Sequence, residues 1–600
     1  MESYKDSIFE PLEYYRDYGK ATHQANVSEY FDDLVKKSGI NVEQNKETVK
    51  KYREKQKLID SMNKKLNGHK LLRTFSIIGA ILLFIVSLII AFSTESSALQ
   101  IILPLSAIAI GVALIILAFK LTSKKIKALE RKINNEELLA FGLRKEAEAQ
   151  MAPLNALFSD DDTLRLIEKT LPQVKFDREF LFVNLEDLKN NYGFNGIAGD
   201  KTSVLDVVSG KLYKNPFLFE RALNEGIGSQ TYTGTMMISW TVYDKDSKGR
   251  TVPRVRTQML VANVVKPKPI YDITTLLSYG SQAAPDLSFA RENKHFEDLS
   301  EKQIEREVKK GEKKLKKKSE KAISRGKSFT EMANTKFDVL FDATNRDNEQ
   351  QFRVMFTPLA QREMIDLIRS EEGYGDDFDF FKRKKLNVIR SEHSQKWDMS
   401  TSAAKYYSFD IDESRHLFSK FNNEYFKSVY FDFAPIIAIP VYQDPPTSSY
   451  EEIARPDISY TEYNYEAIAN RIGAEKFAHP NSATKPILKT ELVKRSKGVD
   501  TVAVTAYSYS AAPRTDFIPT LGGDGRMHAV PVPWVEYIPE QKTSLMTVTN
   551  IGLSETEYLS KIGTIGEVLA PENATCYKGI FAFTGTGGES ANTFINLLRK

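Results

Sequence analysis

The chain has 600 residues, more than one ordinary domain holds, so two or three folded units are expected. Its 83 basic and 79 acidic residues leave a formal net charge of +4. A balance this close excludes any argument for a nucleic-acid partner from overall charge. Cys576 is the single cysteine, which rules out an intramolecular disulfide bond and agrees with a reducing cytoplasm. We expect Cys576 to be an inert structural thiol.

Residues 1–70 are predicted to form cytoplasmic helices, because their apolar residues recur at helical spacing. Two uncharged apolar runs follow, Thr74–Phe92 and Ala98–Phe119. Each is about as long as the roughly 20 residues that cross the hydrocarbon core of a bilayer. They are separated by the short connection Ser93–Ser97. Residues 71–120 are therefore predicted to form a transmembrane helical hairpin.

The charges that flank the hairpin predict its orientation. Basic residues precede the first run and follow the second: Lys64, Lys65, Lys70, Arg73, Lys120, Lys124, Lys125, Lys127, Arg131 and Lys132. The connection carries a single formal charge, Glu95. Lys and Arg near span ends stay on the cytoplasmic side. Both termini and the large region after the hairpin are thus predicted to be cytoplasmic.

Residues 121–150 are predicted to continue as a helical stalk. Their thin apolar stripe contains Ile126, Leu129 and Ile133 among many charges, and a similar stripe runs through residues 45–66 before the hairpin. A narrow stripe fits a stalk that packs on itself, and it fits equally a stalk that packs on a second copy or on another protein.

Residues 151–290 are predicted to be a mixed α+β domain. Asp160–Asp162 resembles the acidic start of a helix. Tyr232–Tyr243 and Thr251–Val265 are rich in β-branched and aromatic residues, and a turn-forming cluster separates them. This pattern predicts a β-hairpin.

Residues 291–330 are predicted to contain a strongly basic helix. Its candidate contacts to anionic lipid are Lys309, Lys310, Lys313, Lys314, Lys316, Lys317, Lys318 and Lys321. A basic residue near an anionic membrane surface contributes about 1 kcal/mol to binding. Nucleic acid is the less favoured partner, because no stacking aromatic residues accompany the lysines. A solvated helix without a ligand is the preferred interpretation, because runs of charge usually form a solvated face, and anionic lipid is the favoured partner if there is one.

Residues 331–445 are predicted to be the second part of the α+β domain. Phe337–Phe341 has the composition of an apolar strand. Val429–Val441 is too short to span a bilayer and is interpreted as a buried strand pair or a strand and turn. Residues 446–600 are predicted to be a β-rich domain, with strands at Val502–Ser508 and Leu545–Val548. Glycine-rich turns are expected at residues 522–525 and 585–588.

Residues 337–368 carry a resemblance to a known family. The apolar segment Phe337–Phe341 is followed by a polar Asn-Arg-Asp-Asn-Glu stretch, by Phe352–Pro358 and by an amphipathic helix carrying Met364. This order resembles an uncharacterised family of bacterial membrane-anchored proteins, often encoded beside LemA-type proteins, in which a transmembrane hairpin precedes the soluble domain. The resemblance extends loosely over residues 151–420. It implies a protein of the bacterial inner membrane and no catalytic residues.

Motifs of known chemistry are absent from the sequence: there is no phosphate-binding loop, no zinc-binding histidine pair and no nucleophile elbow. The densest group of potential metal ligands is Asp410, Asp412, Glu413 and His416. Surface carboxylates near a helix start are the preferred interpretation of this group. We assign no catalytic residue, no cofactor and no metal site.

The sequence as a whole predicts an α+β protein: a transmembrane hairpin with a helical stalk, then mixed α/β cytoplasmic domains and a β-rich C-terminal unit. The favoured function is a membrane-anchored scaffold that binds another protein or itself. The alternatives are a membrane-tethered enzyme with a dispersed active site and an anionic-lipid-binding protein acting through the basic helix.

Overall fold

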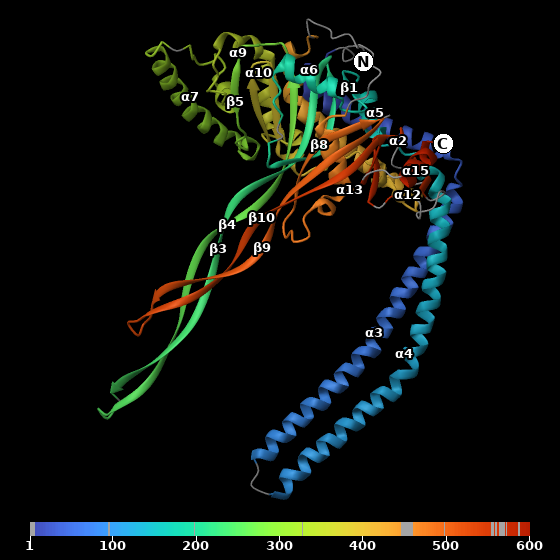
Figure 1. Cartoon of the computed structure of the whole chain (residues 1–600), viewed down its shortest axis with the longest axis vertical. Coiled ribbons are helices and arrows are strands. Elements are labelled where there is room, and N and C mark those ends of the chain that lie inside the picture. The colour runs from blue at the N-terminus through green and yellow to red at the C-terminus, as the bar shows by residue number, and fades with distance from the viewer. Residues whose placement is uncertain are drawn as a thin grey trace. The chain divides into compact units, whose positions relative to one another are not determined.

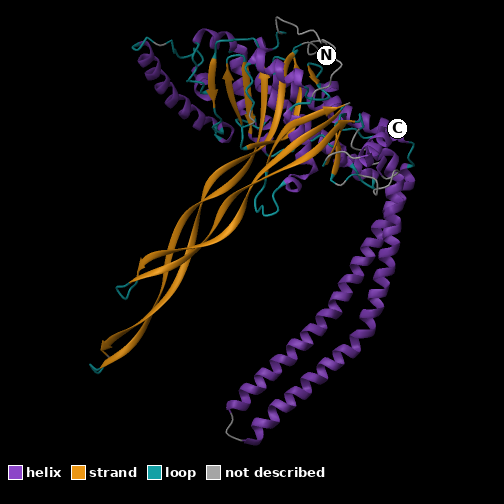
Figure 2. Ribbon diagram, in the orientation of Figure 1, coloured by secondary structure: helices purple, strands orange, loops and turns teal. Residues whose placement is uncertain are grey.

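The computed structural model describes residues 7–93, 97–196, 199–245, 247–326, 328–445, 460–496, 498–553, 557–558, 561–562, 571, 573–585 and 589–599. Helices and antiparallel sheets both occur in it, which confirms the predicted mixture of α and β structure (Figure 2). The chain forms two compact units. The smaller unit comprises residues 30–158 and 405–418, and the other described residues form the larger unit.

Two long helices dominate the smaller unit, α3 over Val42–Ser93 and α4 over Ser97–Asn155. They run side by side (Figure 1). Their charged halves meet in an apolar seam that contains Ile59, Leu66, Ile126, Ile133 and Ala140. The ammonium of Lys55 also lies 2.6 Å from a carboxylate oxygen of Glu136 across this seam. Of the arrangements left open for the stalk, the structure shows the one in which it packs on itself.

The apolar halves of α3 and α4 expose their side chains. Within the most apolar stretch of each helix, 11% is buried in α3 and 22% in α4. A core helix of a soluble protein would bury such a stretch. Both helices are long and apolar enough to cross a membrane, as the sequence predicts.

The larger unit is built on a seven-stranded antiparallel sheet with the strand order β1-β2-β3-β4-β7-β6-β5. Its strands are β1 Val174–Phe176, β2 Thr202–Leu212, β3 Asn215–Lys245, β4 Thr251–Gly280, β5 Ser288–Arg291, β6 Phe378–Arg383 and β7 Leu386–Ser391. The hairpin predicted at residues 232–265 is confirmed, and its strands are much longer than the sequence indicates. β3 pairs with β4 without a register shift from Phe217↔Tyr279 to Lys245↔Thr251.

A large aromatic core covers one face of this sheet. It joins sheet residues such as Phe217 and Phe380 to helix residues such as Phe337, Phe352 and Phe433. The helices and short helical turns of the N-terminal part are α1 Pro11–Tyr14, η2 Tyr15–Gly19, α2 Lys20–Ser38, α5 Asp162–Thr170, α6 Phe182–Tyr192 and η3 Phe296–Asp298. Those that follow are α7 Glu301–Ile323, α8 Thr335–Phe341, α9 Glu349–Met355, α10 Pro358–Arg369, η4 Glu371–Gly373, α11 Glu392–Gln395, η5 Ala403–Tyr406, α12 Ile411–Ile437 and η6 Pro440–Tyr442.

A second antiparallel sheet has the order β11-β12-β10-β9-β8. Its strands are β8 Ile487–Ser496, β9 Val499–Leu521, β10 Met527–Asn550, β11 Ala574–Tyr577 and β12 Ile580–Thr584, and the helices beside it are α13 Glu462–Phe477 and α15 Glu589–Arg599. The predicted strands at residues 502–508 and 545–548 are confirmed, as is the turn at 522–525. Of the glycine-rich turn predicted at 585–588, residues 586–588 lie outside the described residues.

Two predicted strands are wrong, since the structure makes them helices. Phe337–Phe341 lies in α8, because the side chain of Asn334 caps the backbone N–H of Phe337 and the apolar residues then fall on one helical face. The Val429–Val441 run begins inside α12, a helix apolar enough on all sides to be buried there. Pro435 is tolerated near the end of that helix.

Candidate functional site

The predicted basic helix is confirmed as α7, and each of its candidate lipid-contacting lysines is exposed. The opposite side of α7 packs against the protein through Ile304, Leu315 and Ala322. Gly311 allows the close approach, because a Cβ atom there would lie 2.5 Å from a methyl carbon of Val339 on α8. The apolar side of α7 is thus covered except at Ile323, which is 64% exposed. Binding of α7 to an anionic surface would rest mainly on charge.

Lys318 differs from the other lysines of α7. Its ammonium donates a hydrogen bond to the carbonyl oxygen of Thr344 and lies 5.0 Å from the centre of the Phe329 ring. Burial lowers the pKa of Lys318. Lys318 therefore ties α7 to the rest of the unit, and the other candidate lysines remain for a surface partner.

The two long hairpins, β3–β4 and β9–β10, extend together beyond the two sheets (Figure 1). We define the β arm as residues 226–245 and 251–270 of the first hairpin with 511–521 and 527–537 of the second. Even-numbered residues of both hairpins face one another and form a small apolar core. Its fully buried members are Ile238, Leu260, Ala262, Val530 and Val532. The arm is therefore a two-layered β structure.

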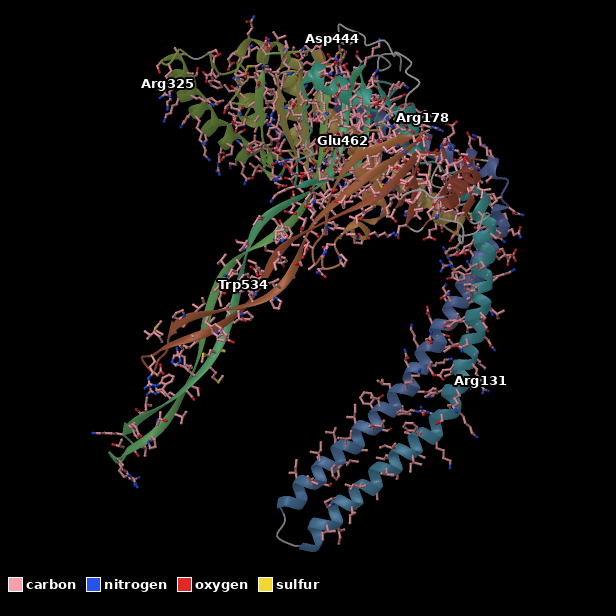
Figure 3. All side chains as sticks on the ribbon, viewed as in Figure 1. Arg131, Arg178, Arg325, Asp444, Glu462 and Trp534 are labelled. Atoms are coloured by element: carbon pink, nitrogen blue, oxygen red, sulfur yellow. The ribbon has the colours of Figure 1, made fainter. Side chains whose placement is uncertain are left out.

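A polar cluster also joins the two layers of the arm. The ammonium of Lys266 lies 2.7 Å from a carboxylate oxygen of Asp516 and 4.1 Å from the centre of the Trp534 ring. The indole N–H of Trp534, labelled in Figure 3, donates to Asp516 over 2.8 Å. The hydrogen bond from Lys266 and that from Trp534 lower the pKa of Asp516. This cluster fixes the layers in one relative position.

The outer face of the β3–β4 layer carries no charge over most of its length. From the pair Ser229↔Pro267 to the pair Tyr243↔Pro253, every odd-numbered residue is exposed and uncharged. These residues are Ser229, Thr231, Thr233, Thr235, Met237, Ser239, Thr241, Tyr243, Pro253, Val255, Thr257, Met259, Val261, Asn263, Val265 and Pro267. Met237 is 73% exposed and Val255 is 71% exposed.

The outer face of the β9–β10 layer is uncharged as well. It consists of Ala511, Pro513, Thr515, Phe517, Pro519, Leu521, Met527, Ala529, Pro531, Pro533, Val535 and Tyr537. Charged residues make up 27% of the chain, yet those of the arm lie on the inward-facing positions or at the tip. Ser and Thr residues make up most of the β3 part of these faces, and exposed apolar residues gather beside them: Met237, Val255, Met259, Val261, Val265 and Phe517. Exposed apolar residues that gather in this way mark a site of interaction.

A hollow of about 450 Å³ is lined by several titratable side chains. His295, Glu297, Asp377, Glu392 and His393 all line it. They come from distant parts of the sequence, so no local spacing could reveal them. Among the described residues, no group of three or more His, Cys, Asp or Glu side chains is arranged to hold a metal ion.

His393, at the wall of this hollow, already has partners for both ring nitrogens. Nδ1 lies 2.5 Å from a carboxylate oxygen of Asp377, and Nε2 lies 3.1 Å from the carbonyl oxygen of Ser428. Burial lowers the pKa of His393, but the charges of Asp432 and Asp377 outweigh it and the net pKa is raised. An imidazolium that donates both protons in this way has no free lone pair for general-base work. We therefore base no function on this hollow.

In the group of potential metal ligands near His416, Asp410 has hydrogen-bond partners within the fold. The carboxylate of Asp410 accepts hydrogen bonds from the guanidinium of Arg53 and from the backbone N–H of Asp412 at the start of α12.

Cys576 is buried at 1% exposure, and its thiol lies 3.4 Å from the carbonyl oxygen of Leu553.

Comparison of the chain with protein-family models, with curated proteins and with solved structures found no match. The family resemblance at residues 337–368 stays a prediction.

Proposed function

We propose that this protein is a scaffold anchored by two spans in the bacterial inner membrane, and that its β arm binds another polypeptide on the cytoplasmic side. The uncharged outer faces of the arm carry this proposal. A scaffold needs apolar surface that is costly to leave in water, and the exposed apolar residues of β4, β9 and β10 on these faces contribute such a surface.

The flanks of the apolar segments support the membrane anchor. The guanidinium of Arg73 donates to the hydroxyl of Thr122 over 2.7 Å and lies 4.5 Å from the centre of the Phe119 ring. These residues stand at the ends of the two apolar runs. Arginine there joins the helices while its charge stays at the level of the lipid headgroups.

The size of the arm fits a protein partner. A strand advances about 3.3 Å per residue and neighbouring strands lie about 4.8 Å apart, so the face between residues 229 and 243 is about 50 Å long and 10 Å wide. One such face, about 500 Å², is below the roughly 800 Å² that each partner buries in a standard interface. Two faces, or one face together with a strand edge, would reach it.

Site-specific photocrosslinking tests this proposal. A photoreactive residue replaces Met237 or Met259 of the full-length protein in cells, and Lys317 on α7 serves as the control position. We expect one discrete covalent adduct from both arm positions and none from position 317. A second variant, Val261→Glu, adds a carboxylate beside the probe and should weaken the adduct at least tenfold, because an unpaired charge is costly to bury. Absence of a discrete adduct at both arm positions would refute the proposal.

The exposed lysines of α7 favour a second function, binding of anionic lipid. A fluorophore on Lys313→Cys would be quenched by dye-labelled lipid in proteoliposomes that contain phosphatidylglycerol, and not in purely zwitterionic ones. Replacement of Lys309, Lys316 and Lys317 by Gln should remove the difference, at about 1 kcal/mol per residue. Equal quenching in both membranes would exclude it.

A further inference from the structure

The prolines of the β arm show which backbone groups point to the open edges of its strands. Opposite residues in an antiparallel pair alternate between those that exchange hydrogen bonds and those whose N–H and C=O groups point away from the partner strand. Proline has no N–H and fits only the second kind. Every proline of the arm is odd-numbered: Pro253, Pro267, Pro269, Pro513, Pro519, Pro531 and Pro533. Odd-numbered residues of the arm therefore direct their backbone N–H and C=O groups to the open strand edges.

Three of the four edges are protected against further pairing. β4 carries three of these prolines, and β9 and β10 carry two each. Each of the three strands also carries charged residues in the arm, such as Arg256, Asp516 and Glu536. Proline and charge are the usual means by which edge strands avoid pairing with other chains.

The edge of β3 has neither form of protection. From Gly226 to Tyr243 the strand contains no proline and no charged residue. β2 pairs with β3 only as far as Asn224. Within the described chain, the remainder of β3 pairs with β4 alone. Every second residue from Ile227 to Tyr243 therefore presents an unpaired N–H and C=O.

We infer that the edge of β3 binds the same edge of a second copy of this chain, as an antiparallel strand pair about a two-fold axis. The inference deepens the proposed function and rests on it, because the membrane anchor would hold the copies in one plane and raise their effective concentration.

The chemistry of the edge suits a second copy. Such a pair is isologous, so the same residues meet from both sides. With Thr235 on the axis, Thr233 would face Met237 of the second copy and Thr231 would face Ser239. Residues 226–243 carry no charge, so no alignment of the two β3 strands places like charges opposite each other. Hydroxyl and apolar residues form favourable cross-strand pairs. The pairing would join two uncharged outer faces into one surface of about 1,000 Å².

The mass of the full-length protein in lipid nanodiscs tests the inference. We expect a dimer. Thr235→Pro removes an outward N–H from the β3 edge without disturbing the β3–β4 ladder, so it should give a monomer. Val261→Pro is the matched control, because residue 261 lies opposite residue 235 and directs its N–H to the edge of β4. The control should stay dimeric.

Thr235→Lys is a second variant that keeps the backbone N–H and places a charge at the edge; it too should give a monomer. A monomeric wild-type protein would overturn the inference, as would a dimer that Thr235→Pro and Thr235→Lys leave intact. Loss of the dimer in Val261→Pro as well would also overturn it, because the effect would not be specific to β3.

Photocrosslinking separates this inference from the proposed function. An adduct between arm residues of two copies supports both. An adduct with a different polypeptide, together with a monomeric wild type, leaves the scaffold proposal standing and refutes pairing through β3. The absence of any adduct from the arm refutes the scaffold proposal itself.

Discussion

Gly234 has the least space for a side chain among the glycines of the β arm, and Gly234→Ala tests the two-layered structure of the arm. A Cβ atom at this position would lie 2.0 Å from the carbonyl oxygen of Pro531 and 2.8 Å from the Cα atom of Val532. Both are backbone atoms, so the layers must separate by about 1 Å, a gap that forfeits a quarter to a half of the dispersion energy of the facing atoms. Overpacking of this kind costs about 1–3 kcal/mol. Alanine recovers about 0.5–1 kcal/mol from the lower entropy of the unfolded chain.

The net loss, about 1–2 kcal/mol, should appear as local opening of the arm. Amide hydrogen exchange measures it, because exchange of protected amides follows the free energy of local opening. We expect exchange in residues 230–242 and 256–264 to accelerate about five- to thirtyfold, because each 1.4 kcal/mol changes the rate tenfold, while exchange in β6 and β7 is unchanged. Gly226→Ala is the control, since its nearest neighbour is a side-chain carbon of Ile270 at 3.3 Å. Unchanged exchange in Gly234→Ala would refute the packing of the two layers.

Three further predictions concern buried groups. Burial lowers the pKa of His23 to about 4 from an ordinary value of 6.5. As the pH falls, the unfolded chain therefore binds the proton first, and the free energy of unfolding should fall by about 3 kcal/mol between pH 6.5 and pH 4. Thermal unfolding should show this loss in the wild type and not in His23→Gln; the same dependence of stability on pH in both proteins would contradict the prediction. The guanidinium of Arg346 lies 2.5 Å from the carboxylate of Asp338 and 2.7 Å from that of Glu349, and all three side chains are buried. Arg346→Met should lower the free energy of unfolding in denaturant by about 3–5 kcal/mol, because it leaves two buried carboxylates without their partner. A loss below 1 kcal/mol would disprove this reasoning. The thiol of Cys576 should react with a disulfide reagent at least 100-fold faster after denaturation than before, and equal rates would show that the thiol is accessible in the fold.

The sequence was a good guide wherever composition alone decides the structure. Long uncharged apolar runs and a lysine-rich helix are recognisable without knowing their neighbours. The segment Phe337–Phe341 is different, because its apolar residues fit a strand and a helix equally well. The cap provided by Asn334 decides between them.

The β arm was only partly predictable. The centre of its first hairpin is rich in β-branched and aromatic residues, but Gly226, Gly228 and Gly234 interrupt the strand composition. Gly234 is explained by the second layer, which residues far along the chain supply: Pro531 and Val532 lie where a side chain of residue 234 would have to be. Gly226 and Gly228 lie instead against the side chain of Ile270 on the paired strand β4. The hollow beside His393 was hidden for a related reason, since tertiary packing alone brings Asp377 and Asp432 to that histidine.

The continuity of α3 has a mechanical consequence. One unbroken helix of 52 residues joins the charged residues that begin at Val42 to the apolar residues that end at Ser93, a length of about 78 Å at 1.5 Å per residue. A twist or a push applied at one end of such a rod arrives at the other end, because the intervening main-chain hydrogen bonds resist deformation. The helix that we propose as an anchor would therefore transmit a mechanical strain between the bilayer and the charged half of the helix.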